Sequence, residues 1–177
     1  MIFYEILKSE ITIAARNIVL DLLNNKEHFY YITLVTSGLA NTPCISAWSL
    51  EALERKCGND KEEAEMLKWS YADSPYCCWK QEYFDKVSKL LCDRGNIWGL
   101  DDIEFEKEYN LRLFAMEEAM KELDKEGIFA LNQDRKNIIV LVEVMPPDGT
   151  NTQQAYRMND SNTEIFNQWI TEASEDI

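Results

Sequence analysis

The sequence has few of the residues on which familiar catalytic and metal-binding sites depend. Histidine occurs once, at His28, and neither a His-Glu-x-x-His nor a Glu-x-x-His spacing is present. Only six glycines occur among the 177 residues, and none belongs to a phosphate-binding loop, a nucleotide fingerprint or a Gly-x-Ser-x-Gly motif. We therefore expect no cofactor and no metal ion, and the case for an enzyme of a familiar type is weakened.

Basic residues and long apolar runs are also scarce. The 18 basic and 32 acidic residues leave a net charge of -14, which repels nucleic-acid backbones and anionic membranes. No apolar run approaches the ~20 residues that span a bilayer, and residues 1–5 lack the basic stretch of a signal peptide. The five cysteines show no disulfide framework: Cys44, Cys57, Cys77, Cys78 and Cys92. We expect reduced thiols, a cytoplasmic location, and neither nucleic acid nor membrane as a partner.

Aromatic residues are plentiful, which favours a well-packed core. Five Trp, eight Tyr and seven Phe supply the surface to bury, and the length fits one domain. No repeat, low-complexity tract or linker divides residues 1–177. We therefore expect a single domain over the whole chain.

Strand signals predict two hairpins. Residues 29–35 are aromatic or β-branched, and Ser37-Gly38 fits a turn before a second short strand. Two further strands are expected at residues 128–131 and 137–144, joined by the polar turn at residues 132–136. Because residues 138–142 are apolar on both faces, we expect the last strand to be central.

Apolar spacing and capping residues predict about six helices. Their expected ranges are 2–23, 49–57, 60–69, 74–95, 103–126, and a final helix opened by Ser161 and Glu164. The expected fold is therefore α+β, with an antiparallel sheet of about four strands from two hairpins, flanked by these helices.

The acidic residues are unevenly distributed. Residues 59–127 hold 18 acidic and 10 basic residues, whereas residues 1–58 are nearly neutral. The densest run opens the longest predicted helix and comprises Asp101, Asp102, Glu104, Glu106 and Glu108. Three interpretations stay open: a divalent-cation site, a docking surface for Lys and Arg of another protein, or a solvated helix start that complements the helix dipole.

A second candidate segment combines aromatic and acidic residues. Trp69 and Tyr76 flank Asp73. Such aromatics suit a protein interface, because Trp and Tyr give a large contact area with a polar tip, but they suit a core layer equally well.

One nucleophile–base pair is conceivable. Cys44 could act as a nucleophile only with a base nearby, and His28 is the one imidazole available across the hairpin. The adjacent Cys77-Cys78 pair lacks the two-residue spacer of redox and zinc motifs.

Five blocks of sequence resemble the bacterial domain of unknown function 4303 family. They are FYYITLVTSG, CISAWSLEALE, KWSYADSPY, VLVEVMPPDGTN and AYRMN, in this order and spacing. The resemblance covers nearly the whole chain, and it implies no activity and no residue roles. Small acidic bacterial domains of this class are similar to immunity proteins of toxin systems, by analogy alone.

These observations predict a non-catalytic, acidic domain that binds a basic protein. By analogy, it would be an immunity-type protein that neutralises a basic toxin. The expected partner-binding residues are Trp69, Asp73, Tyr76, Asp101, Asp102, Glu104, Glu106 and Glu108. The alternatives are an enzyme with a small-molecule site, using Cys44 and His28 or a carboxylate-bound metal, and a subunit of a homo-oligomer.

Overall fold

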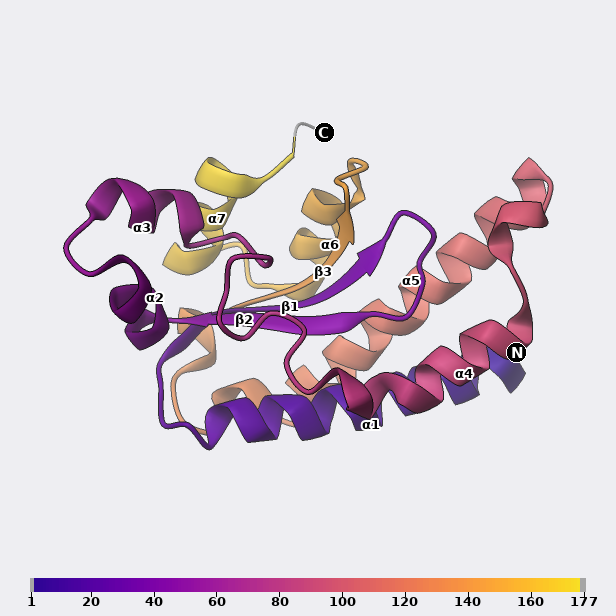
Figure 1. Ribbon diagram of the computed structural model, residues 1–177, viewed down its shortest axis with the longest axis horizontal. Coiled ribbons are helices and arrows are strands. Elements are labelled where there is room, and N and C mark those ends of the chain that lie inside the picture. The colour runs from indigo at the N-terminus through magenta and orange to yellow at the C-terminus, as the bar shows by residue number, and fades with distance from the viewer. Residues whose placement is uncertain (1, 176–177) are drawn as a thin grey trace.

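The chain folds into three layers, with a sheet between two sets of helices. The computed structural model describes residues 2–175, and within them the order of elements along the chain can be followed in Figure 1. Its α-helices are α1 (Ile2–Leu23), α2 (Leu50–Cys57), α3 (Lys61–Leu67), α4 (Asp85–Arg94), α5 (Asp102–Lys125), α6 (Thr150–Met158) and α7 (Glu164–Ala173). Its strands are β1 (Phe29–Ser37), β2 (Cys44–Ser49) and β3 (Ile139–Met145). Short 3-10 helices are η1 (Gln81–Phe84), η2 (Ile97–Gly99), η3 (Ile128–Ala130) and η4 (Arg135–Asn137).

The sheet is mixed, with the order β2-β1-β3. β1 pairs antiparallel with β2, so that Val35 lies opposite Cys44, and the first predicted hairpin is confirmed. On its other side β1 pairs parallel with β3, from Tyr31 beside Ile139 to Ser37 beside Met145. β1 is therefore the central strand, and its residues 29–36 are all buried.

The predicted antiparallel sheet of about four strands is wrong, because the second hairpin does not form. Residues 128–130 are the 3-10 helix η3, whose Phe129 packs into the core, and the described part of the chain has three strands in the sheet. β3 lies at an edge and not in the centre. Its two faces are apolar because helices cover both of them, a pattern that a central strand would share.

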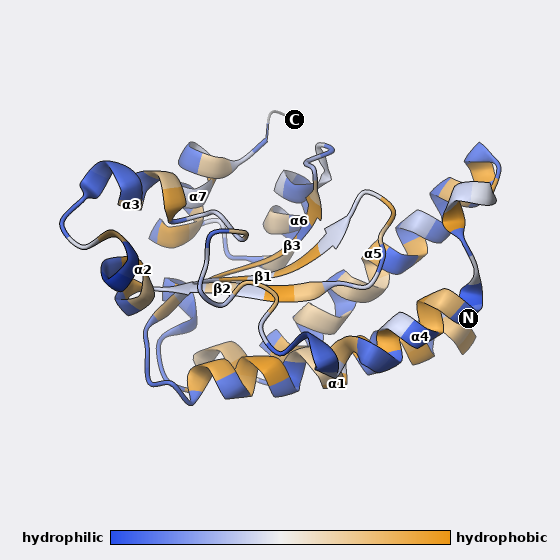
Figure 2. Ribbon diagram, viewed as in Figure 1, coloured by the Kyte–Doolittle hydropathy of each residue, from blue (hydrophilic) through white to orange (hydrophobic). Residues whose placement is uncertain are grey.

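Helices cover the two faces of the sheet. In Figure 1, α1, α4 and α5 lie below it, whereas α3, α6 and α7 lie above it. The apolar face of α5 comprises Leu113, Met116, Met120 and Leu123, which are buried in one cluster with the inner face of α1. Figure 2 shows the strands largely hydrophobic and the long helices two-sided.

Most predicted helix ends are correct, because each depends on a local hydrogen bond. Ser49 accepts from Ala52 N at the start of α2, and Asp60 accepts from Glu63 N at the start of α3. Three helical predictions differ from the structure. Helix α6 has no counterpart among the predicted helices, and α7 begins after Thr163 and not at Ser161.

The third difference is that Ser74 does not open a helix. Residues 70–80 form turns, and the helical segment begins only at η1 and α4. The Ser74 hydroxyl donates to Ala47 O of β2, and Trp79 N donates to Ile45 O at 3.0 Å. These bonds close the outer edge of β2, so tertiary pairing overrides the local helix signal.

The outer edge of β3 is closed by two asparagines at the ends of α6. Asn151 Oδ1 accepts from Val144 N at 2.7 Å, and its Nδ2 donates to Val144 O at 3.1 Å. Asn159 makes the same two bonds with Val140, at 3.0 and 2.8 Å. Each side-chain amide thus pairs with β3 as a neighbouring strand would.

We expect replacement of Asn151 by alanine to destabilise the protein by about 2–4 kcal/mol, because a buried N–H and a buried C=O lose their partners. Chemical denaturation measures the free energy of unfolding, with Asn17→Ala on the exposed face of α1 as the matched control. Equal stability of the two variants would contradict the role assigned to Asn151.

Candidate functional site

The first turn of α5 presents an open acidic surface. Asp101 is the N-cap and accepts hydrogen bonds from Ile103 N and Glu104 N, at 3.0 and 2.9 Å. Asp102, Glu104 and Glu106 are exposed. The negative charges therefore stabilise the positive end of the helix dipole and remain accessible to a partner.

Glu108, the last of this predicted acidic run, faces inward. Its carboxylate accepts from Arg94 Nη2 at 3.1 Å and from Arg112 Nε at 3.0 Å, and Arg112 is 2% exposed. Burial acts to raise the pKa of Glu108, but the hydrogen bonds and charges of the two arginines outweigh it, so the pKa is lowered. Glu108 therefore locks α4 to α5 and is not open to a partner.

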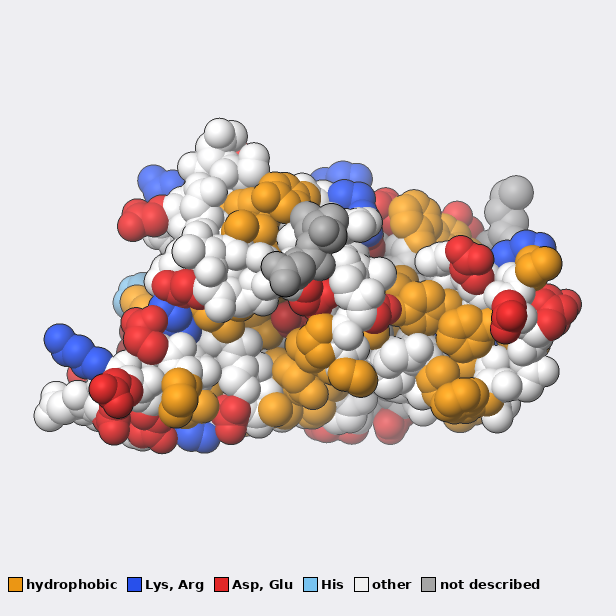
Figure 3. All heavy atoms as spheres, turned by 90° about the horizontal axis from the view of Figure 1, so that it is seen from above, with side chains coloured by type: hydrophobic (Ala, Val, Ile, Leu, Met, Phe, Trp, Pro, Cys, Tyr) orange, Lys and Arg blue, Asp and Glu red, His pale blue; other side chains and the backbone are white. Residues whose placement is uncertain are grey.

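Exposed apolar side chains lie beside the open acids. Trp98 of η2 is 73% exposed and Ile103 of α5 is 66% exposed, with Leu100 between them at the surface. In Figure 3, hydrophobic side chains lie over the middle and the right-hand half of the visible face, and several acidic ones lie at its right-hand end. We call Trp98, Leu100, Asp101, Asp102, Ile103, Glu104 and Glu106 the acidic end. The sequence analysis missed Trp98, although its position between Gly95 and the Asp101 cap indicates a loop at the surface.

The aromatic–acidic segment is mostly packed. Trp69 donates from Nε1 to Glu172 at 2.8 Å and lies edge-on to the ring of Tyr30. Tyr76 is 7% exposed, and its hydroxyl donates to Glu27 at 2.9 Å. Of the three predicted residues in this segment, only Asp73 is exposed.

The two predicted groups do not form one site. In Figure 1, the start of α5 lies at the right-hand end, whereas the segment that follows α3 lies on the left, over β2. Any surface that uses both groups would have to extend over most of the molecule.

Cys44 and His28 also lie apart, so their pairing as nucleophile and base is wrong. Phe29, next to His28, is opposite Ser49, while Cys44 pairs with Val35 at the other end of the hairpin. Six residues of extended strand separate the two ends by about 20 Å. His28 Nδ1 instead lies 2.5 Å from Glu51 Oε1.

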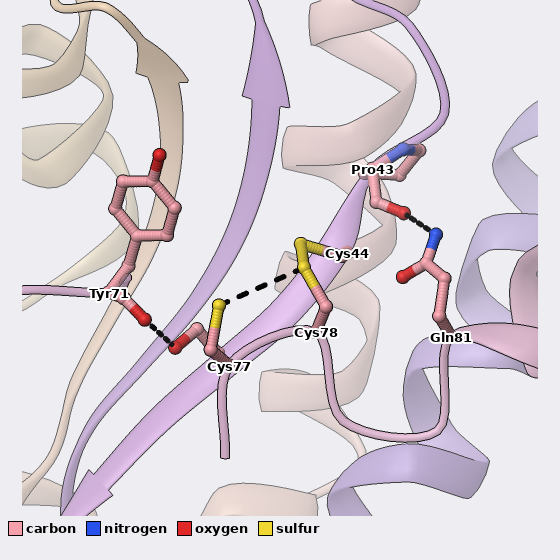
Figure 4. Close-up of a disulfide and its surroundings, with 7 residues drawn as sticks. Pro43, Cys44, Tyr71, Cys77, Cys78 and Gln81 are labelled. Carbon is pink, nitrogen blue, oxygen red and sulfur yellow. Dashed lines mark hydrogen bonds between the residues drawn. A yellow bond between two sulfur atoms is a disulfide. The ribbon is translucent and has the colours of Figure 1, made fainter. Parts of the chain in front are cut away.

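Cys44 forms a disulfide with Cys78, which corrects the expectation of reduced thiols (Figure 4). The Cα atoms are 4.9 Å apart, and the bond ties the start of β2 to the segment that covers its edge. The Cys77 thiol lies 3.9 Å from Cys78 Sγ. Burial, with the charge of Asp73, raises the pKa of Cys77, so this thiol is a weak nucleophile at neutral pH.

Two further findings bear on the predicted alternatives. Residues 2–175 contain no group of three or more His, Cys, Asp or Glu side chains arranged to hold a metal ion. None of the helices in the same range combines the length and the apolar character needed to cross a membrane.

Comparison with known proteins identifies one family. The family described as "Domain of unknown function (DUF4303)" matches residues 11–160, which cover every strand and most of the helices. No curated protein and no solved structure matches the chain.

We expect Glu108→Gln to lower the free energy of unfolding at pH 7 by about 3 kcal/mol, because the buried Arg112 loses its countercharge. The lowered pKa means that ionised Glu108 stabilises the fold above its ordinary value of 4.5, and that this stability is lost as the pH falls through the lowered pKa. The deficit of the variant should therefore shrink below pH 4.5 in denaturation curves. Glu106→Gln, at an exposed position of the same helix, should show no such deficit.

The Cys44–Cys78 disulfide predicts how many cysteines react with a thiol reagent. Unfolded without reductant, air-equilibrated protein should show three reactive thiols, from Cys57, Cys77 and Cys92, and five after reduction. Cys44→Ser should raise the unreduced count to four by freeing Cys78. Five reactive thiols in the unreduced wild type would show that the bond does not form.

Proposed function

We propose that the chain, which belongs to the family described as "Domain of unknown function (DUF4303)", is a non-catalytic domain that binds a basic protein. The observation that supports this proposal is the acidic end, where Trp98 and Ile103 are mostly exposed among open carboxylates. Large exposed apolar side chains beside charges are typical of protein interfaces, in which Trp is a frequent anchor.

Electrostatics favours a basic partner. The whole chain carries a charge of -14, so its field attracts a positive surface over long range and accelerates association. At short range Asp102, Glu104 and Glu106 offer carboxylates without ion pairs among the described residues. Trp98 then supplies the apolar contact area that charge pairs at a wet surface lack.

The finer proposal is an immunity-type protein of a bacterial cytoplasm, with a basic toxin as its partner. It is supported by the acidic field and by the absence of a matched nucleophile and base in Cys44 and His28. In a reducing cytoplasm the Cys44–Cys78 bond would be open to reduction.

The test is a pull-down with the tagged protein from its native cells, washed at low salt and at ~0.5 M salt, where charges are screened within a few Å. We expect a basic protein that is retained at low salt. The triple variant Asp102→Lys, Glu104→Lys, Glu106→Lys should weaken its binding at least about tenfold, because like charges then face each other across the interface. Trp98→Ala should weaken the binding at both salt concentrations.

The matched control is Glu54→Lys, Glu62→Lys, Glu82→Lys, which changes the net charge equally at exposed positions on α2, α3 and η1. Equal loss of binding in the two triple variants would show that only net charge matters. Unchanged binding in the first triple variant and in Trp98→Ala would refute the proposed interface.

A further inference from the structure

A groove between α5, α6 and the start of α1 has the dimensions of a small-molecule site. Its volume is about 670 Å³, within the range of about 300–1,000 Å³ that is typical of ligand pockets. It lies outside the acidic end, and the proposed function makes no use of it.

One part of the groove is aromatic. Tyr4 of α1 and Phe114 of α5 stack with ring centroids 5.7 Å apart and an angle of 18° between the planes. Phe114 is 51% exposed, which leaves its ring accessible at a concave surface. A flat apolar group can be buried against these rings, and the hydrophobic effect favours that burial.

Another part of the groove presents a positioned guanidinium. Arg157 of α6 donates from Nε and Nη2 to Glu117 of α5, at 2.9 and 2.7 Å. Glu117 is 3% exposed and also accepts from Lys121 at 2.6 Å, so its charge is already compensated. Among the described residues Arg157 Nη1 has no hydrogen-bond partner. The two N–H groups of this nitrogen therefore remain for a ligand.

The charge of the groove is opposite to that of the protein. Its wall carries Lys107 and Arg157 against the single carboxylate of Glu117, in a chain whose net charge is -14. Lys107 is exposed and forms no ion pair within residues 2–175. Two cations in a locally positive hollow favour an anion over a cation or a neutral molecule.

A buried amide lies in the wall of the groove. Gln154 of α6 lines the groove and is 2% exposed. Its Nε2 donates to Thr150 Oγ1 at 3.4 Å, whereas its Oε1 has no hydrogen-bond partner in the described structure. Because this oxygen is itself buried, it is not open to a ligand in the groove, and Gln154 contributes to the wall by packing alone.

We propose that this groove binds a small aromatic carboxylate. The ligand carboxylate accepts from Arg157 Nη1, and charge-assisted bonds of this kind are the strong ones. The Lys107 ammonium, in the same groove, attracts the carboxylate from further along α5. The ring packs against Phe114 and Tyr4. Glu117 is a positioning residue, since it orients Arg157 and does not contact the ligand.

The test is isothermal titration calorimetry of the full-length protein with para-hydroxyphenylacetate. We expect saturable binding, and binding at least about tenfold weaker for the neutral para-hydroxyphenylacetamide, because the charge-assisted bonds are lost. Phenylacetate, which keeps the ring and the carboxylate, should bind with an affinity similar to that of para-hydroxyphenylacetate. No binding of para-hydroxyphenylacetate, or equal binding of the acid and its amide, would overturn the proposal.

Variants locate the site. Lys107→Gln and Arg157→Gln should each weaken the binding of para-hydroxyphenylacetate at least about fivefold. Phe114→Ala should weaken the binding of all three probes. Lys125→Gln removes the same charge from an exposed position of α5 outside the groove, and its affinity should equal that of the wild type. Lys107 is a surface residue, so this variant tests the site even if Arg157→Gln fails to fold. Equal affinity of Lys107→Gln and Lys125→Gln would place the probe elsewhere and refute the site.

Discussion

Pairing of the backbone polar groups of a short sheet, at both edges, is the constraint on which the structure depends. A sheet of three strands has two edges for one central strand, so β2 and β3 each turn a row of N–H and C=O groups outwards. Residues 70–80 pair with β2, and the amides of Asn151 and Asn159 pair with β3. Because helices also cover both faces, β1 is buried along nearly its whole length.

Pairing of the two sheet edges also accounts for the five sequence blocks that resemble the family. The blocks FYYITLVTSG and CISAWSLEALE form β1, β2 and α2, and KWSYADSPY supplies the cover of the β2 edge. VLVEVMPPDGTN and AYRMN contain β3 together with Asn151 and Asn159. These blocks are therefore largely architectural, which is consistent with a family whose description states no activity. The acidic end lies outside all of them.

Helix α5 separates two surfaces of opposite character. At its start, carboxylates that cap the helix or face solvent surround exposed apolar side chains. Further along, Glu108 and Glu117 turn inward and hold Arg94, Arg112 and Arg157. The inward carboxylates join α5 to α4 and α6, and through Arg157 they leave positive charge at the groove. One acidic helix thus carries open carboxylates at its start and holds cations at the groove further along, for reasons of side-chain direction alone.

Features that depend on neighbours in the chain could be predicted from the sequence. Helices α1 and α5, the β1–β2 hairpin and the caps at Ser49, Asp60 and Asp101 follow from periodicity and from bonds between residues two to four apart. The parallel pairing of β1 with β3 could not be predicted, since β3 follows β1 by about a hundred residues. The apolar run of β3 suits a central strand and a covered edge strand alike. Tertiary contacts likewise decided that Ser74 bonds to β2 and opens no helix, that Cys44 meets Cys78, and that Glu108 is buried while Asp102 is open. Sequence alone determined the net charge of the chain and its local elements, and only the packing of distant segments decided which charges remain at the surface.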